Sequence, residues 1–239
     1  MKEERMNRRT APISGKIHLS LPTSWSELSD DQLRYIVEMA CSMTMEEVQQ
    51  YFFARLVTNQ DSRAWLAPGE QLGIAMETLD WMQEPPEQPV RLAAIGGVSA
   101  VDVLLHGVPF SHYIMIENYY QGFVISQQPQ AIDGAASLLY PGLPRSYKIS
   151  DGERYSILMW LSALKSVFSQ EWPHFFRKAS DDSELPDMKE VMNAEIRALT
   201  GGDVTKEEVV QRIDCWRALT ELDEKAREAA ELASKLNQG

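Results

Sequence analysis

The sequence predicts a mainly α-helical protein with one small β element (α+β), in which a multi-helix core is followed by a C-terminal helical hairpin. Three observations support this prediction. Ser or Thr followed three residues later by Glu or Gln, the spacing of a capping box, recurs along the chain before apolar residues with helical periodicity. Two adjacent glycines, Gly201 and Gly202, separate two amphipathic segments near the C-terminus. The β-compatible runs are few and short.

The N-terminal part is predicted to contain an arm, a short strand and two helices. Residues 1–15 are polar and form a flexible arm in this interpretation. Residues 16–21 alternate polar and apolar side chains, which predicts a half-buried strand that ends at Pro22. Three capping-box pairs then predict helices within residues 24–58: Ser24 with Glu27, Ser29 with Gln32, and Thr44 with Glu47.

The middle of the chain combines helices with the β element. Apolar spacing predicts a helix over residues 72–82, which Pro85 and Pro86 terminate. Residues 90–94 and 101–105 are β-compatible and flank Gly96 and Gly97, so we expect a small hairpin there, in one sheet with the N-terminal strand. Two further helices are predicted over residues 110–125 and 131–140.

A helix that begins after the capping pair Ser150 and Glu153 is expected to be the central one. Residues 155–164 are apolar on nearly every side, which is typical of a helix enclosed by others. Residues 16–178 thus form the main domain. The acidic segment 179–186 is predicted to be a linker, and residues 187–239 form the C-terminal hairpin.

The residues between the two helices of that hairpin predict where the first helix ends and the next begins; we call this segment the joint. Gly201 and Gly202 can adopt the left-handed backbone that ends a helix, and Thr205 with Glu208 fits the capping box of the next one. We expect Trp216 to pack beneath this joint. Farther along, apolar residues recur at alternating intervals of three and four residues, which predicts a coiled-coil seam. We expect this seam to pack on the protein's own helices rather than to mediate self-association. The seam residues are Leu219, Leu222, Ala226, Ala229, Ala233 and Leu236.

Composition restricts the class of function. The formal net charge is −12, with a pI of about 4.8, which disfavours sequence-independent binding to phosphate backbones. The only two cysteines, Cys41 and Cys215, fit neither a disulfide framework nor a metal pair, so a reducing cytoplasm is expected. The N-terminus has no secretory signal pattern, and no apolar run approaches the roughly 20 residues of a membrane span.

No catalytic, cofactor-binding or metal-binding motif is present in the sequence, so no cofactor, metal or small-molecule substrate is predicted. Two alternatives remain open. One is an enzyme whose site is assembled from distant residues such as His106, His112, Glu117 and Asp151. The other is a DNA-binding regulator that uses the helix pair at the joint, where acidic residues outnumber the basic ones.

Two aromatic segments are typical either of a core or of a protein–protein contact. Large amphipathic side chains gather in residues 117–123 and 172–176. If exposed, they would anchor a partner. The candidate contact residues are Tyr119, Tyr120, Phe123, Trp172, Phe175 and Phe176.

Several segments resemble an uncharacterised protein family whose members look like products of the structural gene modules of Mu-like prophages in gut bacteria. The similar segments are residues 21–25, 108–110, 117–123, 192–207 and 215–227, and the similarity extends from about residue 21 to residue 227. The resemblance transfers no functional residue. It implies a non-enzymatic structural or assembly protein, such as a tail-region assembly factor or chaperone-like binder, with other phage structural proteins as partners. The bacterial cytoplasm or the virion is then its location.

Overall fold

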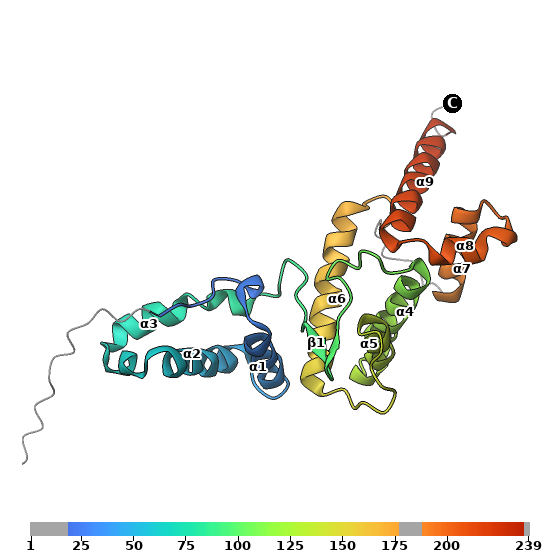
Figure 1. Ribbon diagram of the computed structural model, residues 1–239. Helices are drawn as coiled ribbons and strands as arrows, with labels where there is room; N and C mark the ends of the chain where they lie inside the picture. The colour runs from blue at the N-terminus through green and yellow to red at the C-terminus, as the bar shows by residue number, and fades with distance from the viewer. Residues whose placement is uncertain (1–18, 177–187, 237–239) are drawn as a thin grey trace, which may run out of the picture.

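The computed structural model describes residues 19–176 and 188–236 (Figure 1). It confirms the predicted fold class, because helices predominate in these residues and the β structure is one two-stranded antiparallel sheet. Figure 1 shows an elongated molecule. Helices α2 and α3 extend from one end, α9 projects from the other, and α6 lies in the middle with α4 and α5.

The N-terminal helices begin largely where their caps predict. Both bonds of the capping box form at Ser29 and at Thr44. The box expected at Ser24 is wrong, because Glu27 instead accepts from the backbone N–H and the hydroxyl of Thr23, at 2.7 and 3.0 Å. The helix predicted over 72–82 is divided into α3 and a 3-10 turn. The elements are η1 Trp25–Glu27, α1 Asp30–Ala40, α2 Met45–Asp61, η2 Ser62–Leu66, α3 Gly69–Glu77 and η3 Asp80–Gln83.

A β hairpin forms at the predicted turn, but the strands predicted over 90–94 and 101–105 are wrong, since residues 90–93 and 101–105 are in no strand. Strands β1 (Ala94–Ile95) and β2 (Val98–Ser99) have two residues each, and Gly96 and Gly97 form the turn with φ of 57° and 77°. The expected N-terminal strand lies partly outside the described residues, and residues 19–21 are in no strand. The Gln60 side-chain amide pairs with the backbone of Ser20 as a neighbouring strand would. It accepts from the Ser20 N–H at 2.7 Å and donates to the Ser20 C=O at 2.8 Å.

The central elements confirm the predicted helices. Helix α6 begins at the capping box of Ser150 and packs against α1 on one side and η4 on another. Trp160, in its middle, is 0 % exposed. These elements are α4 Phe110–Ser126, η4 Pro129–Ile132, α5 Asp133–Leu139 and α6 Asp151–Glu171.

The glycine joint ends α7 (Met188–Thr200) as predicted but starts the next helix differently. Gly201 and Gly202 have φ of 64° and 84°, and the Gly202 N–H donates to the C=O of Arg197, which is the bond of a Schellman motif. Thr205 does not cap α8 (Glu207–Arg212), and Glu208 pairs with Arg212 instead. The N-cap is Asp203, which accepts from the backbone and the hydroxyl of Thr205 at the start of η5 (Val204–Lys206).

A break that the sequence interpretation missed separates α8 from α9 (Cys215–Leu236). Ile213 is extended there, and Asp214 forms an antiparallel bridge with Pro109. The Asp214 carboxylate accepts from the N–H of Gly107 at 2.6 Å and from the N–H of Trp216 at 2.9 Å. One carboxylate therefore caps α9 and joins it to the loop before α4.

Only the first half of α9 packs on the body. Leu219 and Leu222 are 0 % and 4 % exposed and belong to the same core cluster as residues of α4 and α6. Farther along the predicted seam, Ala229, Ala233 and Leu236 are exposed. Packing on the protein's own helices, the favoured alternative, thus accounts for half of the seam. The predicted domain boundary at 179–186 lies outside the described residues.

Replacing Gly201 and Gly202 by valine is expected to destabilise the C-terminal region by about 1–2 kcal/mol per residue, because β-branched side chains resist positive φ. An added Cβ would meet nothing within 4 Å at either position, so backbone strain is the sole cause. Thermal unfolding followed by circular dichroism measures the loss. The matched control is Gly73→Ala. Gly73 lies in α3, a Cβ added there also meets nothing within 4 Å, and its φ is not positive. This variant should therefore be more stable than the wild-type protein. An unchanged melting temperature in the valine variant would contradict the strain argument.

Candidate functional site

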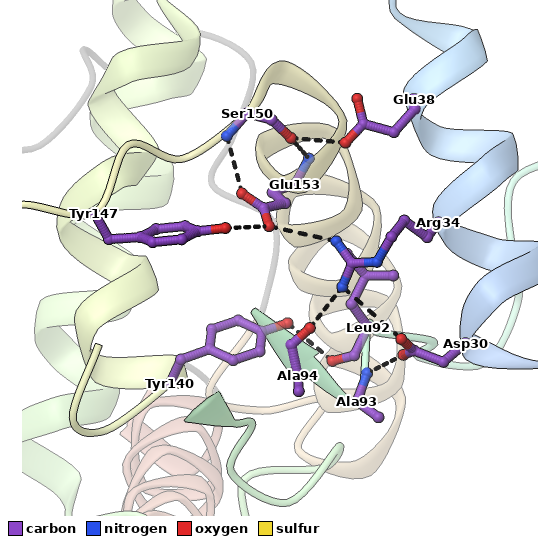
Figure 2. A network of polar contacts seen from close by, with 10 residues as sticks. All are labelled: Asp30, Arg34, Glu38, Leu92, Ala93, Ala94, Tyr140, Tyr147, Ser150 and Glu153. Carbon is purple, nitrogen blue, oxygen red and sulfur yellow. Dashed lines mark hydrogen bonds and ion pairs between the residues drawn. The ribbon is translucent and has the colours of Figure 1, made fainter. Parts of the chain in front are cut away.

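A polar network joins α1, the β hairpin and the start of α6 (Figure 2). At its centre is Glu153, which is 3 % exposed. One carboxylate oxygen of Glu153 accepts from the Ser150 N–H at 2.9 Å, which is part of the capping box of α6. The other accepts from the Tyr147 hydroxyl at 2.9 Å and from the Arg34 guanidinium at 3.4 Å. We call Arg34, Tyr147, Ser150 and Glu153 the Glu153 clasp.

Arg34 extends the clasp from α6 to the β hairpin. Its other terminal nitrogen donates to the C=O of Ala94 at 2.7 Å and lies 3.8 Å from the carboxylate of Asp30. Asp30 in turn accepts from the backbone N–H of Ala93, as Figure 2 shows. These bonds hold the chain before the hairpin against α1.

The packing around the clasp is tight. The Ser150 hydroxyl donates to Glu38 of α1 at 2.8 Å, and a Cβ added to Gly152 would lie 2.5 Å from the carboxyl carbon of Glu38. Tyr140 is 0 % exposed, its hydroxyl donates to the C=O of Leu92, and burial raises its pKa far above the usual value. Because its groups are engaged with one another, the clasp is typical of a structural connection that fixes α1 on α6.

A second charged cluster lies on α4, α6 and α7. Glu117 of α4 accepts from the Gln121 amide at 2.7 Å and forms an ion pair with Lys165 of α6. The Lys165 ammonium also lies 5.2 Å from the centre of the Tyr120 ring, a cation–π distance. The side chains of Glu117 and Lys165 are 19 % and 33 % exposed, so the pair is partly shielded from water.

Glu195 of α7 is the titratable group that this cluster perturbs. Burial, and to a lesser extent the charge of Glu117, raises the pKa of Glu195 to about 7. The pKa of the buried Tyr113 is raised as well, first by burial and then by Glu117 and Glu195. A carboxyl that exchanges its proton near neutral pH is found both in acid–base catalysis and at packed interfaces. Sequence reasoning missed Glu195, because its neighbours come from helices far away in the chain.

Two of the four residues suggested for a distant-residue enzyme site, Glu117 and Asp151, lie too far apart to share one. His106 stacks on Trp216 with ring centres 4.2 Å apart, and His112 is exposed. Asp151 pairs with Arg154 at 2.8 Å at the start of α6, whereas Glu117 pairs with Lys165 fourteen residues later. This separation corresponds to roughly 20 Å along a helix. Asp151 and Glu117 therefore do not share a site.

Trp216 packs in an aromatic cluster at the base of α9. Its ring meets Phe168 and Trp172 edge-on at 5.7 and 4.9 Å, and its indole N–H donates to the C=O of Leu104 at 2.6 Å. Trp216 thus packs against Phe168 of α6, against Trp172 directly after α6, and against residues 104–106. Trp172, a candidate partner residue, is 3 % exposed and belongs to this core cluster instead.

The other candidate contact residues are half-buried. Tyr119 packs over Gly134, where an added Cβ would lie 2.1 Å from the ring. Tyr120 lies beneath Lys165, and Phe123 follows on the same helix. Phe175 and Phe176 meet edge-on at 4.8 Å, and Asp223 of α9 accepts from the Phe175 N–H at 2.8 Å. These side chains are mainly packing groups with a limited exposed part.

More strongly exposed apolar side chains lie at the far end of the α2–α3 pair. Trp65 and Leu66, in the 3-10 turn η2 between the two helices, are 45 % and 71 % exposed. The neighbouring Ala64 is buried, and the Trp65 ring meets Phe53 edge-on at 6.2 Å, so the turn is anchored. We call Trp65 and Leu66 the distal tip. The sequence signal was two consecutive large apolar residues in an interhelical loop.

In the described part of the chain, no group of three His, Cys, Asp or Glu side chains is placed to hold a metal ion. Among residues 19–176 and 188–236, no helix has both the length and the apolarity needed to cross a bilayer. No protein-family model, curated protein or solved structure matches this sequence.

Proposed function

We propose that the protein is a non-enzymatic structural or assembly protein of a Mu-like prophage, which acts in the tail region by protein–protein contact. The observation that supports a contact protein is the distal tip. Trp65 and Leu66 are large, adjacent and exposed, and an exposed tryptophan is typical of an interface anchor. The tail-region assignment rests on the resemblance of residues 21–227.

The fold presents the tip away from the body. Helix α2 runs from α1 to the tip, and α3 returns from it (Figure 1). At the other end of this arm, the Glu153 clasp fixes α1 on α6. A partner can therefore cover the tip without displacing the central helices.

A pull-down of the tagged protein from cells in which the element is induced, identified by mass spectrometry, tests this proposal. We expect stoichiometric recovery of tail or capsid proteins, and a loss of at least about tenfold with Leu66→Glu, because a charge in an interface core is costly. The matched control is Ile125→Glu at the end of α4, where the isoleucine is 63 % exposed. Recovery of no phage protein, or equal recovery with Leu66→Glu, would contradict the proposal.

An enzyme is the second candidate, and the observation in its favour is Glu195, whose pKa of about 7 suits proton transfer at neutral pH. In this case Glu195→Gln should abolish the protein's contribution to particle yield after induction, without lowering its melting temperature and with partner recovery unchanged. Normal particle yield from the Glu195→Gln variant would exclude Glu195 as an acid–base catalyst.

A further inference from the structure

The second half of α9 projects from the body (Figure 1). We call residues 224–236 the free half of α9, only in the sense that none of them belongs to the core cluster. None of these residues is buried, and residues 231–236 are all exposed. Leu232 and Leu236 are 61 % and 82 % exposed, values far above those of Leu219 and Leu222 in the packed half. Within the described residues, no part of the chain buries these two leucines, so they are accessible to a partner.

The free half has one apolar side and one charged side. The apolar residues continue the seam of the packed half, while the charged residues other than Lys225 occupy the opposite side at helical spacing. Lys225 lies at the edge of the apolar side, one heptad before Leu232. This pattern is that of a helix that packs against another helix. The apolar residues are Ala226, Ala229, Ala230, Leu232, Ala233 and Leu236.

The charges of the free half favour a second copy of this chain as the occupant. The chain as a whole has a formal charge of −12, so two copies repel each other over most of their surfaces. The free half, by contrast, has three acidic and three basic residues and is neutral. Arg227 is paired within the helix, with Glu224 at 2.5 Å and Glu231 at 2.7 Å, so no partner of opposite charge is required.

We propose that the free half of α9 pairs with the free half of a second copy, antiparallel about a two-fold axis, to form a weak homodimer. This inference goes beyond the proposed function, because it concerns contacts between copies of this chain and involves no phage partner.

The fold excludes the parallel arrangement. In the packed half the seam faces the protein's own body, where Leu219 and Leu222 are buried. In a parallel pair, the body of the second copy would lie on the seam side of α9, level with the packed half, where the body of the first copy already lies. The two bodies would therefore collide. An antiparallel partner places its body beyond the free end of α9. Antiparallel helix dipoles also attract each other.

The seam is self-complementary in the antiparallel direction. With the two-fold axis near residue 231, Ala226 of one copy faces Leu236 of the other, and Ala229 faces Ala233. The largest seam residue thus meets one of the smallest. Leu232 meets its own counterpart beside the seam. This register covers all six apolar residues and leaves the charged side in water.

The contact between the two free halves buries little surface, so the homodimer is weak. The free half is about 20 Å long. Pairing of two such helices buries well below the ~800 Å² per partner of a standard complex, so we expect a dissociation constant of about 10–100 µM. The homodimer should therefore dissociate on dilution.

Sedimentation of the full-length protein over a concentration series tests the association. The average mass should rise from monomer towards dimer, and Leu232→Glu should weaken the association by at least about tenfold, because two like charges would meet at the axis. Leu66→Glu is the matched control, since Leu66 is an equally exposed leucine at the opposite end of the molecule. A monomer at every concentration, or equal weakening by both variants, would overturn the proposal.

Cysteine cross-linking tests the direction. In a Cys41→Ser background, which removes the exposed native thiol, oxidation of a mixture of Ala226→Cys chains and Leu236→Cys chains should give a disulfide-linked heterodimer. Each variant alone should give no disulfide-linked dimer. Rapid cross-linking of Ala226→Cys chains with one another would instead show parallel pairing and overturn the proposed geometry.

The two glutamate variants of the sedimentation experiment separate this inference from the proposed function. Leu232→Glu should lose self-association while it still recovers phage proteins, and Leu66→Glu should show the reverse. If one proposal fails, the other can still be tested with the same two purified variants.

Discussion

Replacing Glu153 by alanine should destabilise the protein by about 3 kcal/mol, because several donors lose the buried carboxylate that accepts their hydrogen bonds. The substitution leaves the Tyr147 hydroxyl, the Ser150 N–H and the Arg34 guanidinium without their common acceptor. For a chain of this size, such a loss lowers the melting temperature by roughly 10 °C. Thermal unfolding followed by circular dichroism gives the measurement.

Glu47→Ala is the matched control for this prediction. Glu47 occupies the same third position of a capping box, at Thr44 of α2, but it is exposed. Loss of this box should cost only about 1 kcal/mol. If the two variants lose equal stability, Glu153 acts as a helix cap alone, and the clasp adds nothing to the attachment of α1.

Replacing Glu195 by glutamine should stabilise the protein at pH 8 but leave it unchanged at pH 4. The pKa of Glu195 is raised in the folded state, from 4.5 to about 7, so the folded protein holds this proton more tightly than the unfolded chain. The resulting stabilisation is complete below pH 4.5 and is lost as the pH rises through 7. At pH 8 the wild-type protein therefore has a penalty of up to about 3 kcal/mol, which the neutral glutamine removes.

Denaturant unfolding at a series of pH values measures this difference. Glu190→Gln serves as the control, because Glu190 is on the same helix and exposed. It should change the stability by at most a few tenths of a kcal/mol, as is usual for surface sites. Equal stability of the Glu195→Gln variant and the wild-type protein at both pH values would show that the burial of Glu195 has no energetic consequence.

The candidate sites were predictable only where their parts are local. Glu153 was predicted as a cap, because Ser150 lies three residues before it, but its bonds to Arg34 and Tyr147 depend on how α1 meets α6. Glu195 gave no local signal, since the groups that raise its pKa come from other helices. Asp214 is a preferred N-cap type, and this could have indicated the break before α9.

The amino-acid sequence by itself determined the helical class, most helix starts and the glycine joint, since caps, turns and helical periodicity act over a few residues. The boxes at Ser29, Thr44 and Ser150 form as predicted, and Gly201 and Gly202 have positive φ. Only the tertiary structure decided the clasp, the burial of Trp172 and the projection of half of α9, because these depend on which distant surfaces meet.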